Sequence, residues 1–228
     1  MTTPGDADAR ARRRQAVVAG HADDAGTARR LLDDGDPAVR LAALGALARL
    51  GTLDLDAART GAHDVDAAVR RRTGELLGRP GPTDERDGRV ALTLALLDDD
   101  EASVAEVAAA ALGELLGLDP ATGVAPPAPP AAVPALAAAA TSHPDALCRE
   151  SAVAALGAIG HPDGLPAVLA ATGDKPAVRR RAVIALAAFV DHDDAVAALR
   201  HALDDRDWQV RDAAAVLLEG LDPPGPTP

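Results

Sequence analysis

Apolar residues recur along the chain in one fixed pattern, clearest in DPAVRLAALGALARLG at 36–51 and KPAVRRRAVIALAAFV at 175–190. Counting the first valine of each segment as position 0, a small residue stands at +4 and leucine at +8, with arginine at +1. Residues four apart lie on one face of an α-helix. The pattern therefore predicts a helix with a single apolar stripe.

Six copies of this pattern are present. They begin at Val39, Val69, Val104, Cys148, Val178 and Val210, so the spacings are 30, 35, 44, 30 and 32 residues. Before each copy lies a second helix-like segment that ends in acidic residues, such as TARRLLDDGD at 27–36. In five copies an acidic residue at position −3 suits a helix N-cap. Periods of this size indicate stacked helical hairpins.

The line D-x-D-P-x-V-R-x-x-A-x-x-A-L, found at 34–47, resembles HEAT repeats, most closely the short bacterial type named after phycobilin lyases. The resemblance extends over roughly residues 27–221. It implies an all-α fold: an α-solenoid, or superhelix, of about six HEAT-like helical-hairpin repeats with an N-terminal cap helix. The cap carries RRRQAVVAG at 12–20, a faded copy of RRRAVIALA at 179–187.

The same resemblance implies that an aspartate before each second helix and an arginine inside it link neighbouring repeats. Three copies carry both residues at the family's spacing: Asp34 with Arg40, Asp64 with Arg70, and Asp205 with Arg211. In the third copy Ala105 replaces the arginine, and in the fourth His143 replaces the aspartate. We therefore expect the stack to be weakest at repeats three and four.

Proline-rich segments interrupt the repeats and give the expected boundaries. Residues 1–8 should be disordered, and residues 9–118 should hold the cap helix and repeats one to three. Residues 119–134, whose prolines disfavour a helix, form a hinge, a docking segment or a passive insertion. Residues 135–221 should hold repeats four to six, and residues 222–228 a disordered tail.

Composition limits the classes of function. A net charge of −12 disfavours nucleic acid and anionic membranes as partners. Aromatic residues make up only 1% of the chain, whereas HEAT-like enzymes that excise bases need aromatic side chains and a basic groove. The N-terminus lacks an apolar signal core, and one cysteine suits a reducing compartment, so we expect a cytoplasmic protein.

Candidate chemistry is sparse. His63, His143, His161 and His192 stand at expected helix ends, where capping or solvation is favoured over a metal site, because no two lie four apart on one helix. The His-Glu pairs by which HEAT-like deoxyhypusine hydroxylases hold iron do not occur in the sequence. Phosphate-loop and nucleophile-elbow motifs are also missing. We expect no catalytic residue, cofactor or metal.

Positions +2, +3 and +6 of the second helices point away from the apolar stripe and are the expected partner-binding surface. The candidates at these positions, with the residue that opens the last helix, are Leu41, Arg71, Arg72, Glu75, Glu106, Val107, Glu150, Arg180, Arg181 and Trp208. Two arginine pairs separated by acidic residues suit a patterned contact with an extended or helical protein. Trp208 either shields the end of the last repeat or anchors a partner.

The sequence thus favours a non-catalytic scaffold or adaptor that binds a protein through its second-helix, usually concave, face. The alternative, which the resemblance supplies, is an accessory or lyase-like subunit acting on a bound cofactor or pigment, as phycobilin lyases do. Partner identity and oligomeric state stay open at this point.

Overall fold

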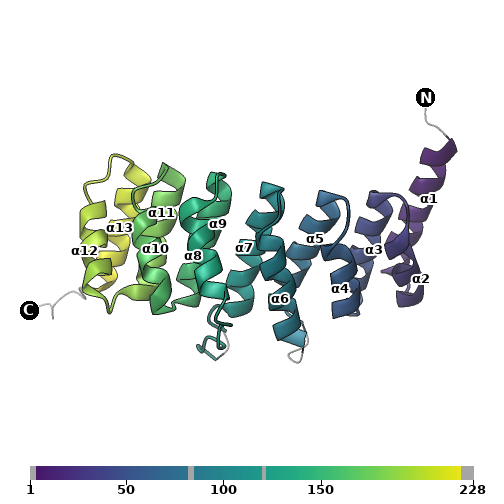
Figure 1. Ribbon diagram of the computed structural model, residues 1–228, viewed down its shortest axis with the longest axis horizontal. Coiled ribbons are helices and arrows are strands. Elements are labelled where there is room, and N and C mark those ends of the chain that lie inside the picture. The colour runs from purple at the N-terminus through teal and green to yellow at the C-terminus, as the bar shows by residue number, and fades with distance from the viewer. Residues whose placement is uncertain (1–3, 82–84, 120–121, 222–228) are drawn as a thin grey trace, which may run out of the picture. The chain divides into compact units, whose positions relative to one another are not determined.

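Helices dominate the part of the chain that the structure, a computed structural model, describes: residues 4–81, 85–119 and 122–221 (Figure 1). Within these ranges there are thirteen α-helices and no strand. The predicted all-α fold class is therefore confirmed.

After the N-terminal helix α1 (Pro4–Ala19), the helices come in six pairs. The first helices are α2 (Ala25–Arg30), α4 (Leu55–Ala62), α6 (Arg86–Leu97), α8 (Ala132–Ser142), α10 (Leu165–Ala171) and α12 (Asp193–Ala202). The second helices are α3 (Pro37–Arg49), α5 (Ala67–Leu77), α7 (Ala102–Leu116), α9 (Ala146–Ile159), α11 (Pro176–Ala185) and α13 (Trp208–Leu221). Short 3-10 helices are η1 (Leu31–Asp33), η3 (Pro162–Gly164) and η4 (Leu186–Phe189).

The second helices begin and pack as the pattern predicts. Asp36, Asp66, Asp145 and Asp207 each accept a hydrogen bond from the backbone N–H two residues later, which satisfies a donor at the helix start. The apolar stripe is fully buried, with Val39, Leu47, Val178 and Leu186 all 0% exposed. Cys148, which replaces valine at position 0, is buried as well.

The N-terminal helix starts earlier than expected. Helix α1 begins at Pro4, so residues 4–8 are helical rather than disordered. A proline in the first turn costs no hydrogen bond, and Asp6 in that turn interacts favourably with the helix N-terminus. The helix packs on α3 as a cap. Residues 1–3 and the expected tail at 222–228 lie outside the described residues.

The chain divides into two compact units, Met1–Ala111 and Leu112–Pro228, which we call the N-terminal and C-terminal units. The division lies inside α7, earlier than the boundary expected at 119–134. Within the N-terminal unit, Gly74 of α5 faces Val107 of α7, and within the C-terminal unit Gly113 of α7 faces Ala155 of α9. Each half of α7 thus packs in its own unit. The role of 119–134 as a hinge stays a prediction.

Consecutive second helices approach each other most closely where a glycine at +9 meets an alanine at +7 of the next repeat. A Cβ atom added to Gly157 would lie 2.7 Å from the Cβ and 2.8 Å from the Cα of Ala185. Gly20, Gly78 and Gly113 face an alanine Cα in the same way, at 2.9 to 3.0 Å. No side chain fits there unless the helices move apart. The sequence pattern of apolar residues at positions 0, +4 and +8 did not predict this contact.

Candidate partner-binding surface

Five arginine–aspartate pairs link consecutive repeats and fix how their second helices lie. They are Arg12–Asp34, Arg40–Asp64, Arg70–Asp99, Arg149–Asp174 and Arg179–Asp205. In each pair both Nε and Nη2 of the arginine donate to the carboxylate, at 2.6 to 3.2 Å. Such two-pronged, charge-assisted hydrogen bonds are strong and directional. We call these five pairs the ladder.

Four ladder arginines also bind their own repeat. Nη1 of Arg40, Arg70, Arg149 and Arg179 donates to the backbone carbonyl of the residue at the ladder-aspartate position before its own helix, at 2.8 to 3.0 Å. Each of these arginines thus binds a backbone carbonyl of its own repeat. The side-chain carboxylate of a ladder aspartate instead binds the arginine of the preceding repeat. This register explains how the ladder can link neighbours.

Two ladder residues were missed in the sequence, although each left a signal. Arg12 aligns with Arg179 in the faded copy at 12–20, so its pairing with Asp34 could have been predicted. Asp174 stands one residue closer to its helix than the other ladder aspartates, which hid it. The ladder of the N-terminal unit ends at Asp99 and that of the C-terminal unit begins at Arg149, as the substitutions at repeats three and four lead one to expect.

The ladder carboxyls are held in the ionised form. Hydrogen bonds from the partner arginines lower the pKa of Asp34, Asp99, Asp174 and Asp205. For Asp64, burial acts most strongly and in the opposite direction, yet the hydrogen bonds it accepts still leave its pKa lowered. These groups therefore serve as permanent anions that hold repeats together.

Acid should destabilise the fold steeply below about pH 4, the ordinary pKa of aspartate. A carboxyl whose pKa is lowered by folding contributes stability that is present above its unfolded-state pKa and lost as the pH falls through its folded-state pKa. Melting temperatures followed by circular dichroism from about pH 7 to about pH 2 would show this loss. An Asp205→Asn variant should melt lower at neutral pH and depend less on acid. Equal acid dependence in both proteins would contradict the assignment.

The candidate residues of the N-terminal unit form a cluster of charges on α5. Arg71 and Arg72 both bind Glu75, at 3.0 and 2.8 Å, so the acid neutralises part of the positive charge. Leu41 on α3 is half-buried against the core of this unit and is less available than expected. Glu106 on α7 is half-buried. Arg71, whose side chain is 48% exposed, is thus the most accessible candidate residue of the N-terminal unit.

In the C-terminal unit the candidates span two helices. Arg181 of α11 donates to Glu150 of α9 at 3.4 Å, which joins repeats four and five. The Nε atom of Arg181 is buried and has no hydrogen-bond acceptor. Arg180, beside it, is half-buried.

Exposed apolar side chains adjoin these charges. Ile184 and Val216 stand at +6 of consecutive second helices and are 43% and 63% exposed. Trp208 is 64% exposed, and whether it shields the end of the last repeat or anchors a partner stays a prediction. Trp208 is the first residue of α13. Sequence reasoning had stressed charges and overlooked Ile184 and Val216.

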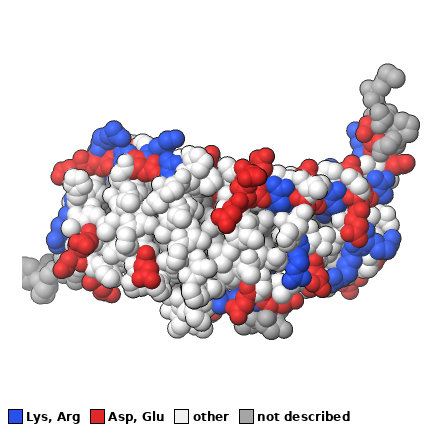
Figure 2. Space-filling model, viewed as in Figure 1, with Lys and Arg blue, Asp and Glu red and all other residues white. Residues whose placement is uncertain are grey.

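The first-helix side of the C-terminal unit has a different character. Figure 2 shows few charged side chains over α8 and α10, and neither helix contains a charged residue. An uncharged surface of alanine and proline offers little to discriminate between partners. We therefore place the candidate surface on the second helices.

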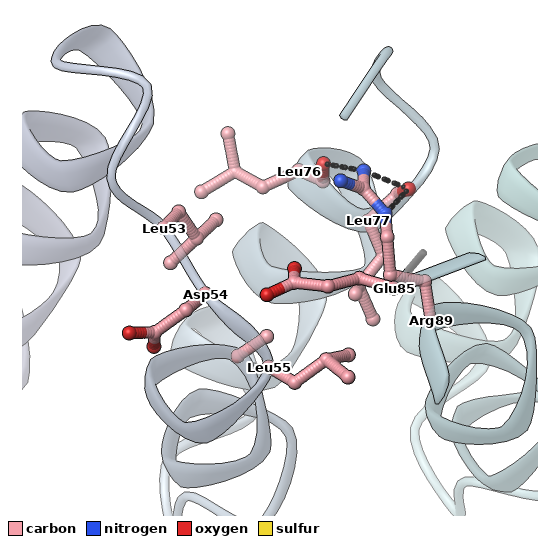
Figure 3. Close-up of a pocket in the computed structure, with 8 residues that line it drawn as sticks. Leu53, Asp54, Leu55, Leu76, Leu77, Glu85 and Arg89 are labelled. Carbon is pink, nitrogen blue, oxygen red and sulfur yellow. Dashed lines mark hydrogen bonds between the residues drawn. The ribbon is translucent and has the colours of Figure 1, made fainter. Parts of the chain in front are cut away.

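One further buried charge was missed in the sequence. Arg89 is 7% exposed and donates to the backbone carbonyls of Leu76 and Leu77 at the end of α5 (Figure 3). It also donates to the carbonyl of Arg79, just after the helix. Burial lowers the pKa of its guanidinium, and the carbonyl end of the helix suits a cation. The small pocket around it is lined by Leu53, Asp54, Leu55, Ala58, Leu76, Leu77, Glu85 and Arg89. Arg89 thus has a structural role in ending α5.

No helix in the described ranges is long and apolar enough to cross a membrane. The same ranges hold no group of three or more His, Cys, Asp or Glu side chains placed to bind a metal ion.

Comparison with known proteins identifies the family. The family model for HEAT repeats matches residues 90–177 and 168–226, together more than half of the chain. The chain belongs to the HEAT-repeat family. No curated protein matches the chain. The HEAT-repeat assignment agrees with the resemblance seen in the repeated line at 34–47.

Solved structures share the fold of this HEAT-repeat protein at low identity. Escherichia coli YibA is 20% identical, with a TM-score of 0.62 over 83% of this chain and 68% of YibA. A chain from the complex of CpcE and CpcF of phycocyanin lyase from Nostoc sp. PCC7120 is 23% identical, with a TM-score of 0.57 over 85% and 75% of the two chains. A designed armadillo repeat protein is 16% identical, with a TM-score of 0.55 over 85% and 98%. These likenesses concern the fold alone.

Proposed function

We propose that this HEAT-repeat protein is a non-catalytic cytoplasmic scaffold that binds another protein through the outer faces of its second helices. The observation that carries the proposal is the exposed pair Ile184 and Val216, at one position of two consecutive helices. Neither side chain belongs to the buried core. At the same position the N-terminal unit has Gly45, Glu75 and Ala110, so the apolar pair is particular to the C-terminal unit.

Charges around the apolar pair support a selective contact. Along the second helices of the C-terminal unit, position +2 carries Glu150, Arg180 and Asp212, so the sign alternates from one repeat to the next. Apolar contacts supply affinity at such surfaces, and surrounding charges select the partner and speed association. Arg71, Arg72 and Glu75 of the N-terminal unit form a second charged surface that the proposal includes, together with Leu41 and Glu106 at its edge.

Replacing both Ile184 and Val216 with glutamate should abolish partner binding and leave the fold intact. Two carboxylates would have to be desolvated in the contact, whereas an exposed substitution usually changes the free energy of unfolding by only about 0.5 kcal/mol. The measurement is affinity capture from the native host with quantitative mass spectrometry, beside melting curves of each variant.

The matched control adds the same two charges elsewhere in this unit. Ala138 on α8 and Ala197 on α12 are exposed on first helices, so Ala138→Glu with Ala197→Glu should keep the partner. Arg180→Glu should weaken binding more at low salt than at high salt. If all variants retain the partner equally, the proposed binding surface is wrong. A chromophore that copurifies with the protein would favour the lyase-like alternative.

A further inference from the structure

Three positions of each second helix face the following repeat. The ladder arginine at +1 reaches forward, as Arg179 does to Asp205. Gly74 at +5 faces Val107 of the next second helix, and Gly157 at +9 faces Ala185. Positions +1, +5 and +9 thus form the forward side of a second helix, which the next repeat normally covers.

In α13 these positions carry Arg211, Ala215 and Glu219, and no repeat follows in the described residues. Arg211 and Glu219 are exposed and Ala215 is half-buried. Nη1 of Arg211 donates to the Asp205 carbonyl at 2.8 Å, as the inner ladder arginines do with their own repeats. The guanidinium is therefore oriented like a ladder arginine, and no ion pair of Arg211 is found within the described residues.

We propose that this side of α13 binds a second copy of the chain, with the two α13 helices antiparallel about a two-fold axis at Ala215. Arg211 lies four residues before Ala215 and Glu219 four residues after it. In an antiparallel pair centred on Ala215, Arg211 of each copy therefore meets the partner's Glu219, and the contact occurs twice. A patch that is complementary to itself in this way is what a two-fold interface requires. The small Ala215 lets the two helices come close.

Two features of α13 favour this arrangement over further head-to-tail stacking. At +9, three other second helices have glycine (Gly78, Gly113 and Gly157), against which the next alanine backbone packs. Glu219 is larger than these glycines and than Ala48 and Ala187 at +9 of repeats one and five, so it disfavours the close approach of another stacked repeat. Trp208 lies one turn before Arg211 and is 64% exposed, so in the antiparallel pair its ring comes beside the ion pair and shields it from water.

Charge-swap variants test the interface by sedimentation velocity over a range of micromolar concentrations. The wild-type mass should approach twice the 23.0 kDa of one chain. Arg211→Glu or Glu219→Arg alone places like charges opposite each other and should raise the dimer Kd at least about tenfold. The double variant restores both ion pairs in reversed order and should return the Kd to within about threefold of wild type.

The control is Arg180→Glu, which changes the net charge equally on a different side of the unit and should leave the dimer unaffected. Melting curves would show that each variant is folded. A wild-type chain that stays monomeric throughout, a mass that grows beyond the dimer, or a double variant that fails to recover would each overturn the proposal. The dimer does not depend on the proposed scaffold function, because the apolar pair at Ile184 and Val216 can fail its own test separately.

Discussion

Replacing Gly157 with leucine is expected to destabilise the protein by about 3 kcal/mol, the upper end of the range for overpacking a close contact. A Cβ at this position would already lie 2.8 Å from the Ala185 Cα, which is backbone and cannot rotate away. The larger side chain forces α9 and α11 apart. Separating them also strains the neighbouring contact between Glu150 and Arg181. Equilibrium unfolding in urea, followed by circular dichroism, measures the loss.

The matched control is Gly45→Leu on α3. Gly45 also lies within a second helix, but no atom comes within 4 Å of a Cβ added there. Because leucine has a higher helix propensity than glycine, this variant should be neutral or up to about 1 kcal/mol more stable. Equal destabilisation at the two positions would mean that loss of glycine, rather than the contact with Ala185, is responsible.

The parts of the fold that were predictable are those set by local sequence. The stripe at 0, +4 and +8 gave the second helices, and the acids at −3 gave four of their N-caps, because both depend only on residues within one or two turns. The six hairpins and the cap helix followed from repetition of those local signals. The disordered start was misjudged, since residues 4–8 gain a helix through continuity with the packed part of α1.

The ladder was harder to predict because its pairs join residues 22 to 29 positions apart along the chain. The family resemblance supplied most of the ladder residues, though not Arg12 and Asp174, and it did not say which carboxylate each arginine binds. Arg89 could not be placed because its acceptors are backbone carbonyls, which every sequence has. The exposure of Ile184, Val216 and Trp208 depends on what covers each helix. The spacing of apolar residues along the sequence does not say what covers a helix.

Arg179→Ala should cost about 3 kcal/mol, near the lower end of the range for breaking a buried ion pair. The Arg179 side chain is 5% exposed and that of Asp205 is 15% exposed, so water can replace the lost guanidinium only in part. In the variant the Asp205 carboxylate would still accept a hydrogen bond from the Asp207 N–H. The Asp174 carbonyl would lose the hydrogen bond that it accepts from Nη1 of Arg179. Urea unfolding at neutral pH measures the cost.

Arg211→Ala is the matched control, because Arg211 holds the same position in α13 but is exposed, and within the described residues its guanidinium donates to the Asp205 carbonyl and to no carboxylate. Measured where the chain is monomeric, this variant should change stability by no more than about 0.5 kcal/mol. The difference between Arg179→Ala and wild type should also shrink below about pH 4, as the pH falls through the lowered pKa of Asp205 and protonation removes from the wild type the ion pair that the variant already lacks. If the destabilisation by Arg179→Ala stays unchanged in acid, Arg179 acts through packing of its side-chain stem and its hydrogen bond to the Asp174 carbonyl. The Asp205 carboxylate would then not be the group that joins repeats five and six.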